Sequence, residues 1–146
     1  MKVKFPLKNN PFRQSRSFVS SNRGSGFIRV RYGTNAKRDR IIADVYFGKR
    51  AEGPPGRVHG GAIASVLDEA MGAAVWLSQN TGYTLKLEVE FLSPTPLCKN
   101  LRLNATVGKI RGRKITAFAS LHLANGVEIV RAKAVFIKKH FPGQRA

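Results

Sequence analysis

The residues best placed to do chemistry lie in one short segment, in which His59-Gly60-Gly61 precedes an apolar helical pattern that contains Asp68. A helix that begins at these glycines presents two unhindered backbone N–H groups, which can bind an anion or the negative charge that develops on a carbonyl oxygen. Glycine has no Cβ to hold a substrate away from the backbone. Asp68, flanked by apolar residues, can act as a general base on water or as a nucleophile.

The spacing of Gly60 and Asp68 limits how they can act together. They are eight residues apart, which is about 12 Å along a helix that rises ~1.5 Å per residue. One carbonyl group cannot lie within ~3 Å of both residues of the same chain. Either only one of them is catalytic, or two antiparallel helices meet and each site takes Gly60 from one chain and Asp68 from the other. We favour the second arrangement, which requires a homodimer or a dimer of dimers.

The helix that must position these groups is predicted over residues 60–79, with a stop at 80–82, because apolar residues recur at three- and four-residue intervals. Alternating patterns predict strands at 26–32, 41–47, 85–91, 101–107, 114–123 and 127–138, with turns at 33–35 and 125–126 and a rigid Pro- and Gly-containing loop at 53–56. On strict alternation Leu85 and Phe91 share the apolar face of the strand at 85–91. Two strands, one long helix and four further strands indicate an α+β domain with five to six antiparallel strands.

The 146 residues are enough for one domain, which we assign to 26–140, between a basic N-terminal arm at 1–25 and a tail at 141–146. The net charge is +18, and residues 1–38 contain ten bases and no acid. Such a field attracts phosphates, nucleic acids, anionic membrane surfaces or acidic proteins, although it also suits a merely solvated surface or an organellar leader. Cys98 is the only cysteine, and no apolar run is long enough to span a membrane, so a reducing, cytoplasmic location is expected.

The motif Glu-Gly-Pro-Pro-Gly at 52–56, followed by His-Gly-Gly at 59–61 and Asp68, resembles the acyl-CoA branch of the phenylacetate-pathway type of hotdog-fold thioesterases. The similarity continues through residues 91–97 and covers about 26–138. It implies a hotdog fold, one long helix wrapped by a curved antiparallel sheet, and hydrolysis of acyl-CoA to a free acid and CoA, with no metal and no organic cofactor.

The resemblance also implies roles for residues. The Gly60 N–H would polarise the thioester carbonyl, Asp68 of the facing subunit would activate water or attack directly, Thr84 would orient the water, and His59 would shape the turn. Many members have an asparagine where this chain has Gly53. Strict alternation also turns Thr84 away from the apolar face, so Thr84 needs a bulge or a strand end to reach the site.

Candidate substrate-binding residues are Gly53, Arg57, Val58 and Gly61, because they surround His59 and Gly60. Further bases that could hold CoA phosphates are Lys109, Arg111, Arg113, Lys114, Lys138 and Lys139. Glu69 is predicted to be solvated or paired with a base. Met71 and Trp76 are predicted in the core. His122 and His140 show no spacing typical of metal ligands.

Two other functions remain open. The charge could dock an acidic acyl-carrier protein in place of free CoA. The fold could also serve a non-catalytic acyl-CoA-binding or regulatory protein, or a nucleic-acid-binding one, although Asp68 is retained and no nucleic-acid motif is present. A dehydratase of the same fold is disfavoured, because no hydratase-type motif is found.

Overall fold

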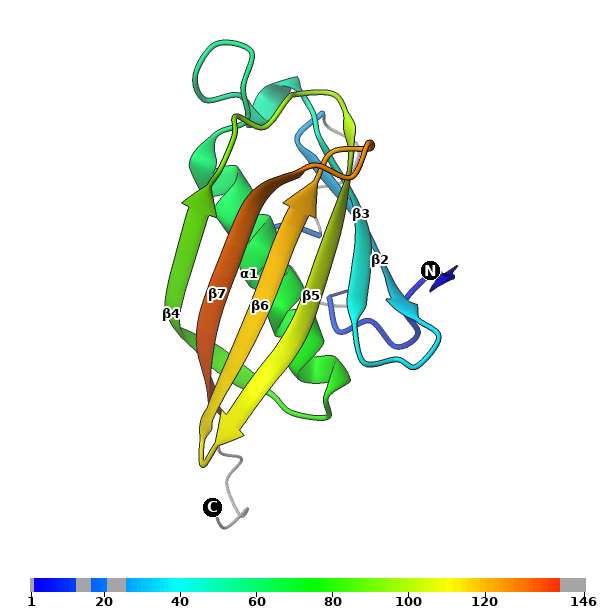
Figure 1. The fold of residues 1–146 in the computed structure, drawn as a ribbon, viewed down its shortest axis with the longest axis vertical. Helices are drawn as coiled ribbons and strands as arrows, with labels where there is room; N and C mark the ends of the chain where they lie inside the picture. Colours follow the sequence, from blue (N-terminus) through cyan, green and yellow to red (C-terminus); the bar gives the residue numbers. More distant parts are fainter. Residues whose placement is uncertain (1, 13–16, 21–25, 140–146) are drawn as a thin grey trace.

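The computed structural model describes residues 2–12, 17–20 and 26–139, which form one curved antiparallel sheet around one long helix (Figure 1). The elements are β1 Val3–Lys4, β2 Ile28–Asn35, β3 Ile41–Phe47, the 3-10 helix η1 Lys49–Ala51, α1 Gly60–Leu77, β4 Gly82–Phe91, β5 Asn100–Arg111, β6 Lys114–His122 and β7 Glu128–Lys138. The strand order in the sheet is β1-β2-β3-β5-β6-β7-β4. The α+β architecture is confirmed, with seven strands where five to six were predicted, because the arm contributes the short β1.

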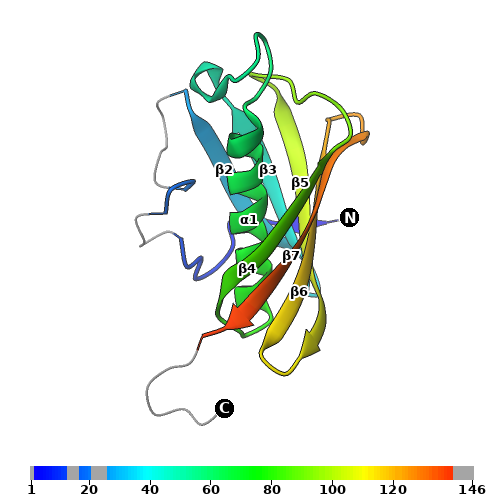
Figure 2. The ribbon, with the colours of Figure 1, turned by 90° about the vertical axis from the view of Figure 1, so that its left-hand side faces the viewer.

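The helix packs on the concave face of the sheet, as the side view makes clear (Figure 2). Its apolar stripe is buried, with Met71 in the core as predicted and Trp76 partly buried against it. Across from it, β6 and β7 pair alanine with alanine, as in Ala117 opposite Ala134. These small side chains allow the helix to approach the sheet closely.

The turn predicted at 33–35 is wrong. Gly33 and Thr34 pair with β3, and Thr34 also pairs with Lys4 of the arm. A Cβ on Gly33 would lie 2.6 Å from the Lys4 carbonyl oxygen, so the glycine permits the arm to pass close to the strand. The chain turns after Asn35, whose side-chain oxygen accepts hydrogen bonds from the backbone N–H groups of Asp39 and Arg40.

The helix also ends earlier than predicted. Gln79 adopts a left-handed backbone with φ 65°, while its N–H donates to the Trp76 carbonyl and the Asn80 N–H donates to the Val75 carbonyl. This is a Schellman motif, which terminates the helix after Leu77. Gly82, expected in the stop, is instead the first residue of β4.

Candidate active site

The loop before α1 is fixed by its own backbone hydrogen bonds. The Gly53 N–H donates to the Arg57 carbonyl at 3.0 Å, the Val58 N–H donates to the Thr95 carbonyl at 3.0 Å, and the His59 N–H donates to the Ala51 carbonyl at 2.8 Å. The prolines and glycines at 53–56 close a tight turn in which Gly56 has φ 75°. The entry to α1 is therefore held in one position.

His59 is the N-cap residue of α1, and its Nδ1 accepts a hydrogen bond from the Gly61 N–H at 2.8 Å. The prediction of two available N–H groups is therefore wrong for Gly61, because the Gly61 N–H already donates to His59. Among the described residues, the Gly60 N–H donates to no protein acceptor. His59 therefore shapes the helix start and leaves one backbone donor at Gly60.

Gly53 lies directly against His59. A Cβ at this position would be 2.8 Å from the His59 Cα, a distance that a side chain could reach only if the loop moved. An asparagine therefore does not fit this loop as it is folded, which is a physical reason for the departure noted in the sequence. Gly53 contacts the capping residue and does not line the groove described next.

A groove of about 440 Å³ lies at the start of α1 and includes Gly60. Its walls come from the loop before the helix and from the end of β4 with the residues that follow: Pro54, Arg57, Val58, Ile63, Phe91, Leu92, Ser93, Pro94 and Thr95. Val58 is buried, whereas Arg57 is exposed and carries the only charge among the described residues of this lining. We call it the Gly60 groove.

Asp68 lies two turns further along α1, where Thr84 Oγ1 donates to its Oδ1 at 2.7 Å. This contact depends on a β-bulge in β4. Thr84 pairs with Phe136 but Lys86 pairs with Val135, so Leu85 is an extra residue without a cross-strand partner. Of the two alternatives given for Thr84, a bulge or a strand end, the structure has the bulge. The same bulge takes Leu85 off the apolar face predicted for it, and Leu85 is 55% exposed. Phe91 stays on that face, opposite Val130, although it is 52% exposed.

Asp68 and Thr84 line a second cavity of about 330 Å³ with Ser65, Glu69, Gly72 and Phe136, and with arm residues Phe12, Ser17, Phe18 and Val19. We call it the Asp68 pocket. It shares no lining residue with the Gly60 groove. Within one chain the two groups therefore face separate cavities, which agrees with the distance argument from helix rise.

Glu69, predicted to be solvated or paired with a base, is bonded to hydroxyl groups in the part of the chain that the structure describes. Its oxygens accept hydrogen bonds from the hydroxyls of Ser17, Ser20 and Tyr32, the last two at 2.6 and 2.8 Å. Burial, followed by the charge of Glu69 and the hydrogen bond to it, holds the pKa of Tyr32 well above its usual value. No spacing rule could have found these partners, because Tyr32 is 37 residues from Glu69 and Ser17 is 52.

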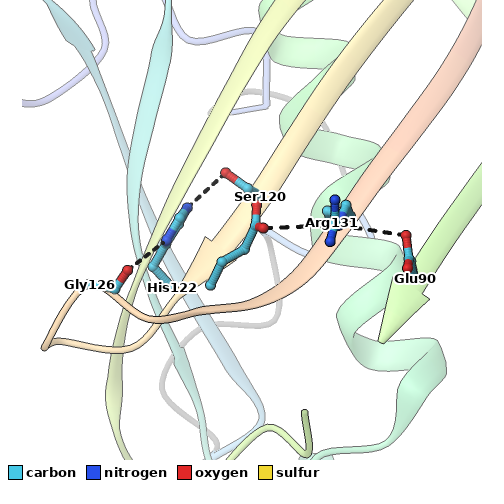
Figure 3. Close-up of polar contacts among 6 residues, drawn as sticks. Glu90, Ser120, His122, Gly126 and Arg131 are labelled. Atoms are coloured by element: carbon cyan, nitrogen blue, oxygen red, sulfur yellow. Dashed lines mark hydrogen bonds and ion pairs between the residues drawn. The ribbon is translucent and has the colours of Figure 1, made fainter. Parts of the chain in front are cut away.

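The later bases do not join Arg57 in one chain. They gather near the β5–β6 turn and the end of β7, at the opposite end of the molecule from the loop before α1 (Figure 1). There Arg113 donates to the Lys138 carbonyl at 3.2 Å. On the outer face of the sheet, His122 contacts Ser120 Oγ at 2.9 Å and the Gly126 carbonyl at 3.2 Å (Figure 3). His140 lies outside the described residues.

A single helix wrapped by a curved antiparallel sheet, with a glycine at the helix start and an aspartate further along it, defines a hotdog-fold protein of the thioesterase type. The family model of the thioesterase superfamily matches residues 55–130, and the chain belongs to this superfamily.

Two curated relatives are acyl-coenzyme A thioesterases named THEM4. The Xenopus laevis protein is 34% identical over 139 residues, which are 91% of this chain and 60% of the relative, and the Rattus norvegicus protein is 29% identical over 133 residues, which are 90% and 57%. The chain thus spans about three fifths of the length of these relatives.

Solved structures give the same fold. A thioesterase superfamily protein has a TM-score of 0.71 and 30% identity over 75% of this chain and 53% of its own. A thioesterase protein of Streptococcus pneumoniae, solved with coenzyme A, has a TM-score of 0.69 and 15% identity over 82% of this chain and 91% of its own. Among the described residues, no helix has the length and apolar character of a membrane span.

Proposed function

We propose that this chain is an acyl-CoA thioesterase. The Gly60 N–H donates to the thioester carbonyl oxygen, and Asp68 of the facing subunit removes a proton from an attacking water or attacks the carbonyl carbon itself. In the second route, water then hydrolyses the acyl-aspartate anhydride. Either way the C–S bond breaks and the products are a carboxylic acid and the CoA thiol.

The observation that carries the proposal is the hydrogen bond from Thr84 to Asp68 at 2.7 Å. A β-bulge turns Thr84 toward the helix, where it holds the Asp68 carboxylate. Regular strand pairing would point the Thr84 side chain away from the helix. In solved variants of the Streptococcus pneumoniae thioesterase protein, an aspartate and a threonine sixteen positions apart are each replaced by alanine. Asp68 and Thr84 have the same separation.

The exposed edge of β4 supports the proposal that a second subunit completes the site. This strand is ten residues long and, in the part of the chain that the structure describes, ends the sheet and pairs only with β7. Tyr83, Leu85 and Phe91 along it are 60%, 55% and 52% exposed. A long edge strand with exposed apolar side chains is a template for pairing with another chain.

Antiparallel pairing of two β4 edges across a two-fold axis near Leu87 would complete the site. Thr84 of one chain would then lie level with Phe91 of the partner subunit, and Phe91 is the side chain nearest Gly60 in its own groove. Asp68, bonded to Thr84, would approach the partner's Gly60 groove. The same pairing would bring the bases near Lys138, which is paired with Gly82, toward the partner's Arg57, where CoA phosphates would need them.

The activity is tested by steady-state assays of the purified chain against short, medium, long and aromatic acyl-CoAs, with release of free thiol as the readout. We expect turnover on at least one of these classes. Absence of turnover on all of them would contradict the proposal.

The shared site is tested by mixing two variants, one with Asp68→Asn and one with Gly60→Ala, after separate purification and joint refolding. Each mixed dimer has one site with both groups intact, so random pairing should restore about one quarter of the wild-type rate. If both groups acted within one chain, the mixture would be no more active than the average of its parts.

One observation favours an acyl-carrier protein as the carrier, namely the net charge of +18, which would attract an acidic partner. A kcat/KM higher on the acyl-carrier thioester than on the CoA thioester, and steeply reduced by salt, would identify that carrier. The cytoplasmic location stays a prediction.

A further inference from the structure

The N-terminal arm is attached to α1 at the residue next to Asp68. Among the described residues, Glu69 accepts three hydroxyl hydrogen bonds, two of them from the arm residues Ser17 and Ser20. The third comes from Tyr32, which is 3% exposed. Hydrogen bonds to an ionised acceptor are about twice as strong as neutral ones. The Glu69 carboxylate thus holds the arm against the helix at a defined point.

The attachment places apolar arm residues around Asp68. Phe12 packs against the Tyr32 ring at a centroid distance of 5.9 Å, and Phe18 meets the Phe27 ring edge-on at 6.4 Å. Val19 is buried in the core. These three side chains form one wall of the Asp68 pocket, and Phe136 lies in its lining as well. In Figure 2 the described parts of the arm that follow β1 lie on the side of α1 opposite to β6.

The two cavities differ in charge. Among the described residues, the lining of the Asp68 pocket has two carboxylates, Asp68 and Glu69, and no base, which disfavours the phosphates of CoA there. The described lining of the Gly60 groove has Arg57 and no carboxylate. A thioester whose carbonyl lies between the two would therefore direct its CoA arm along the Gly60 groove. Its acyl chain would then lie against the apolar walls of the Asp68 pocket.

We infer that the arm residues Phe12, Phe18 and Val19, fixed by the Ser17 and Ser20 hydrogen bonds to Glu69, form the surface that binds the acyl chain and sets its preferred length. This inference rests on the proposed function and adds the direction in which the substrate lies. The pocket volume of about 330 Å³ is at the lower end of the usual range for small-molecule sites. Phe18 is 63% exposed, so the wall is open on one side and offers contact rather than obstruction.

The test is the ratio of kcat/KM for dodecanoyl-CoA to that for butanoyl-CoA in the double variant Phe12→Ala/Phe18→Ala. The longer chain has more apolar surface to place against the aromatic wall, so the ratio should fall about tenfold. Phe118→Ala, which removes an exposed phenylalanine from the outer face of the sheet, is the matched control and should keep the wild-type ratio. A ratio in the double variant that is unchanged or raised would overturn the inference.

The role of Glu69 is tested with Ser17→Ala/Ser20→Ala, which removes the two arm hydroxyls but leaves the wall side chains. The ratio should fall in the same direction and by less, and Ser17→Thr/Ser20→Thr should restore it. A Ser-to-Ala variant with the wild-type ratio would show that the hydrogen bonds do not position the wall.

Binding separates failure of this inference from failure of the proposed function. S-dodecyl-CoA and S-butyl-CoA are thioethers that cannot be hydrolysed, and their dissociation constants can be measured by calorimetry even if no turnover is found. The Phe12→Ala/Phe18→Ala variant should lose affinity for the dodecyl compound only. Equal affinities in wild type and variant would overturn the inference whatever the activity.

Discussion

The Gly60 groove and the Asp68 pocket, which lie at different levels of the same helix, are built in different ways. The groove is made by the loop that runs into α1 and by the chain around the end of β4. The pocket is made by four segments that are distant in sequence, namely the arm, the middle of α1, the start of β4 and the end of β7. The first cavity therefore needs two segments, 54–63 and 91–95, whereas the second exists only after the sheet and the arm have assembled.

The charged residues of the two cavities also differ in where in the sequence their surroundings come from. Arg57 belongs to the loop that forms the groove, while the Glu69 carboxylate of the pocket accepts hydrogen bonds from residues that are distant in sequence. The comparison indicates that carbonyl polarisation is a property of one short motif. Selection of the acyl chain would instead be a property of the tertiary structure, and the two can be changed separately.

The largest effect is expected from Asp68→Asn, which removes the base or nucleophile from the pocket and leaves the groove intact. We expect kcat to fall by roughly 10²–10⁴-fold. The fold and the affinity for an acyl-CoA thioether should be preserved, because asparagine has the same shape and can still accept from Thr84. Thiol release and calorimetry measure the two quantities. Normal turnover would show that Asp68 is not catalytic.

The complementary substitution, Gly60→Ala, changes the Gly60 groove and leaves the Asp68 pocket intact. The new Cβ would lie 3.5 Å from the Phe91 ring, an ordinary contact, so the protein should fold. A methyl group beside the N–H donor should lower kcat by about 10–100-fold, less than loss of an oxyanion donor altogether.

Gly72→Ala, the same change in the middle of the helix, has room beside Phe136. It should raise the free energy of unfolding by about 0.5–1 kcal/mol, measured by urea unfolding.

An intermediate effect is expected from Thr84→Ala, which leaves Asp68 in place without its hydroxyl partner. Loss of a hydrogen bond to a charged group costs about 1.5–3 kcal/mol, so kcat/KM should fall by at least about tenfold. Thr84→Ser keeps the hydroxyl and should retain most of the activity. If both variants lost activity equally, the threonine would matter for the bulge and not for the carboxylate.

The smallest effect is a pH dependence of stability caused by Tyr32. Its pKa is raised in the folded state by burial and by Glu69, so the folded chain holds this proton more tightly than the unfolded chain does. The free energy of unfolding should therefore decrease as the pH rises above ~10, the ordinary pKa of tyrosine. Urea unfolding of wild type and Tyr32→Phe across this range measures the contribution, because the variant should show a shallower decrease. Equal slopes would contradict it.

Much of the fold was predictable because its signals are local. The apolar stripe of α1 gave the start at Gly60, and alternation gave Ile41–Phe47 as β3 with its observed bounds. Two errors arose where a neighbouring segment decides the backbone. Gly33 stays in β2 because the arm passes over it, and Leu85 turns outward because the bulge adds a residue to β4.

The candidate site divides in the same way. The sequence by itself determined Gly60, His59 and Asp68, because a helix start and a helical spacing are properties of consecutive residues. The cap that His59 forms on the Gly61 N–H is local as well, since the two residues are two positions apart. Tertiary structure alone decided that Thr84 reaches Asp68 and that Glu69 binds hydroxyls from the arm and from β2. The physical reason is that a hydrogen bond requires two groups within about 3 Å. For partners far apart in the chain, only the folded backbone sets that distance.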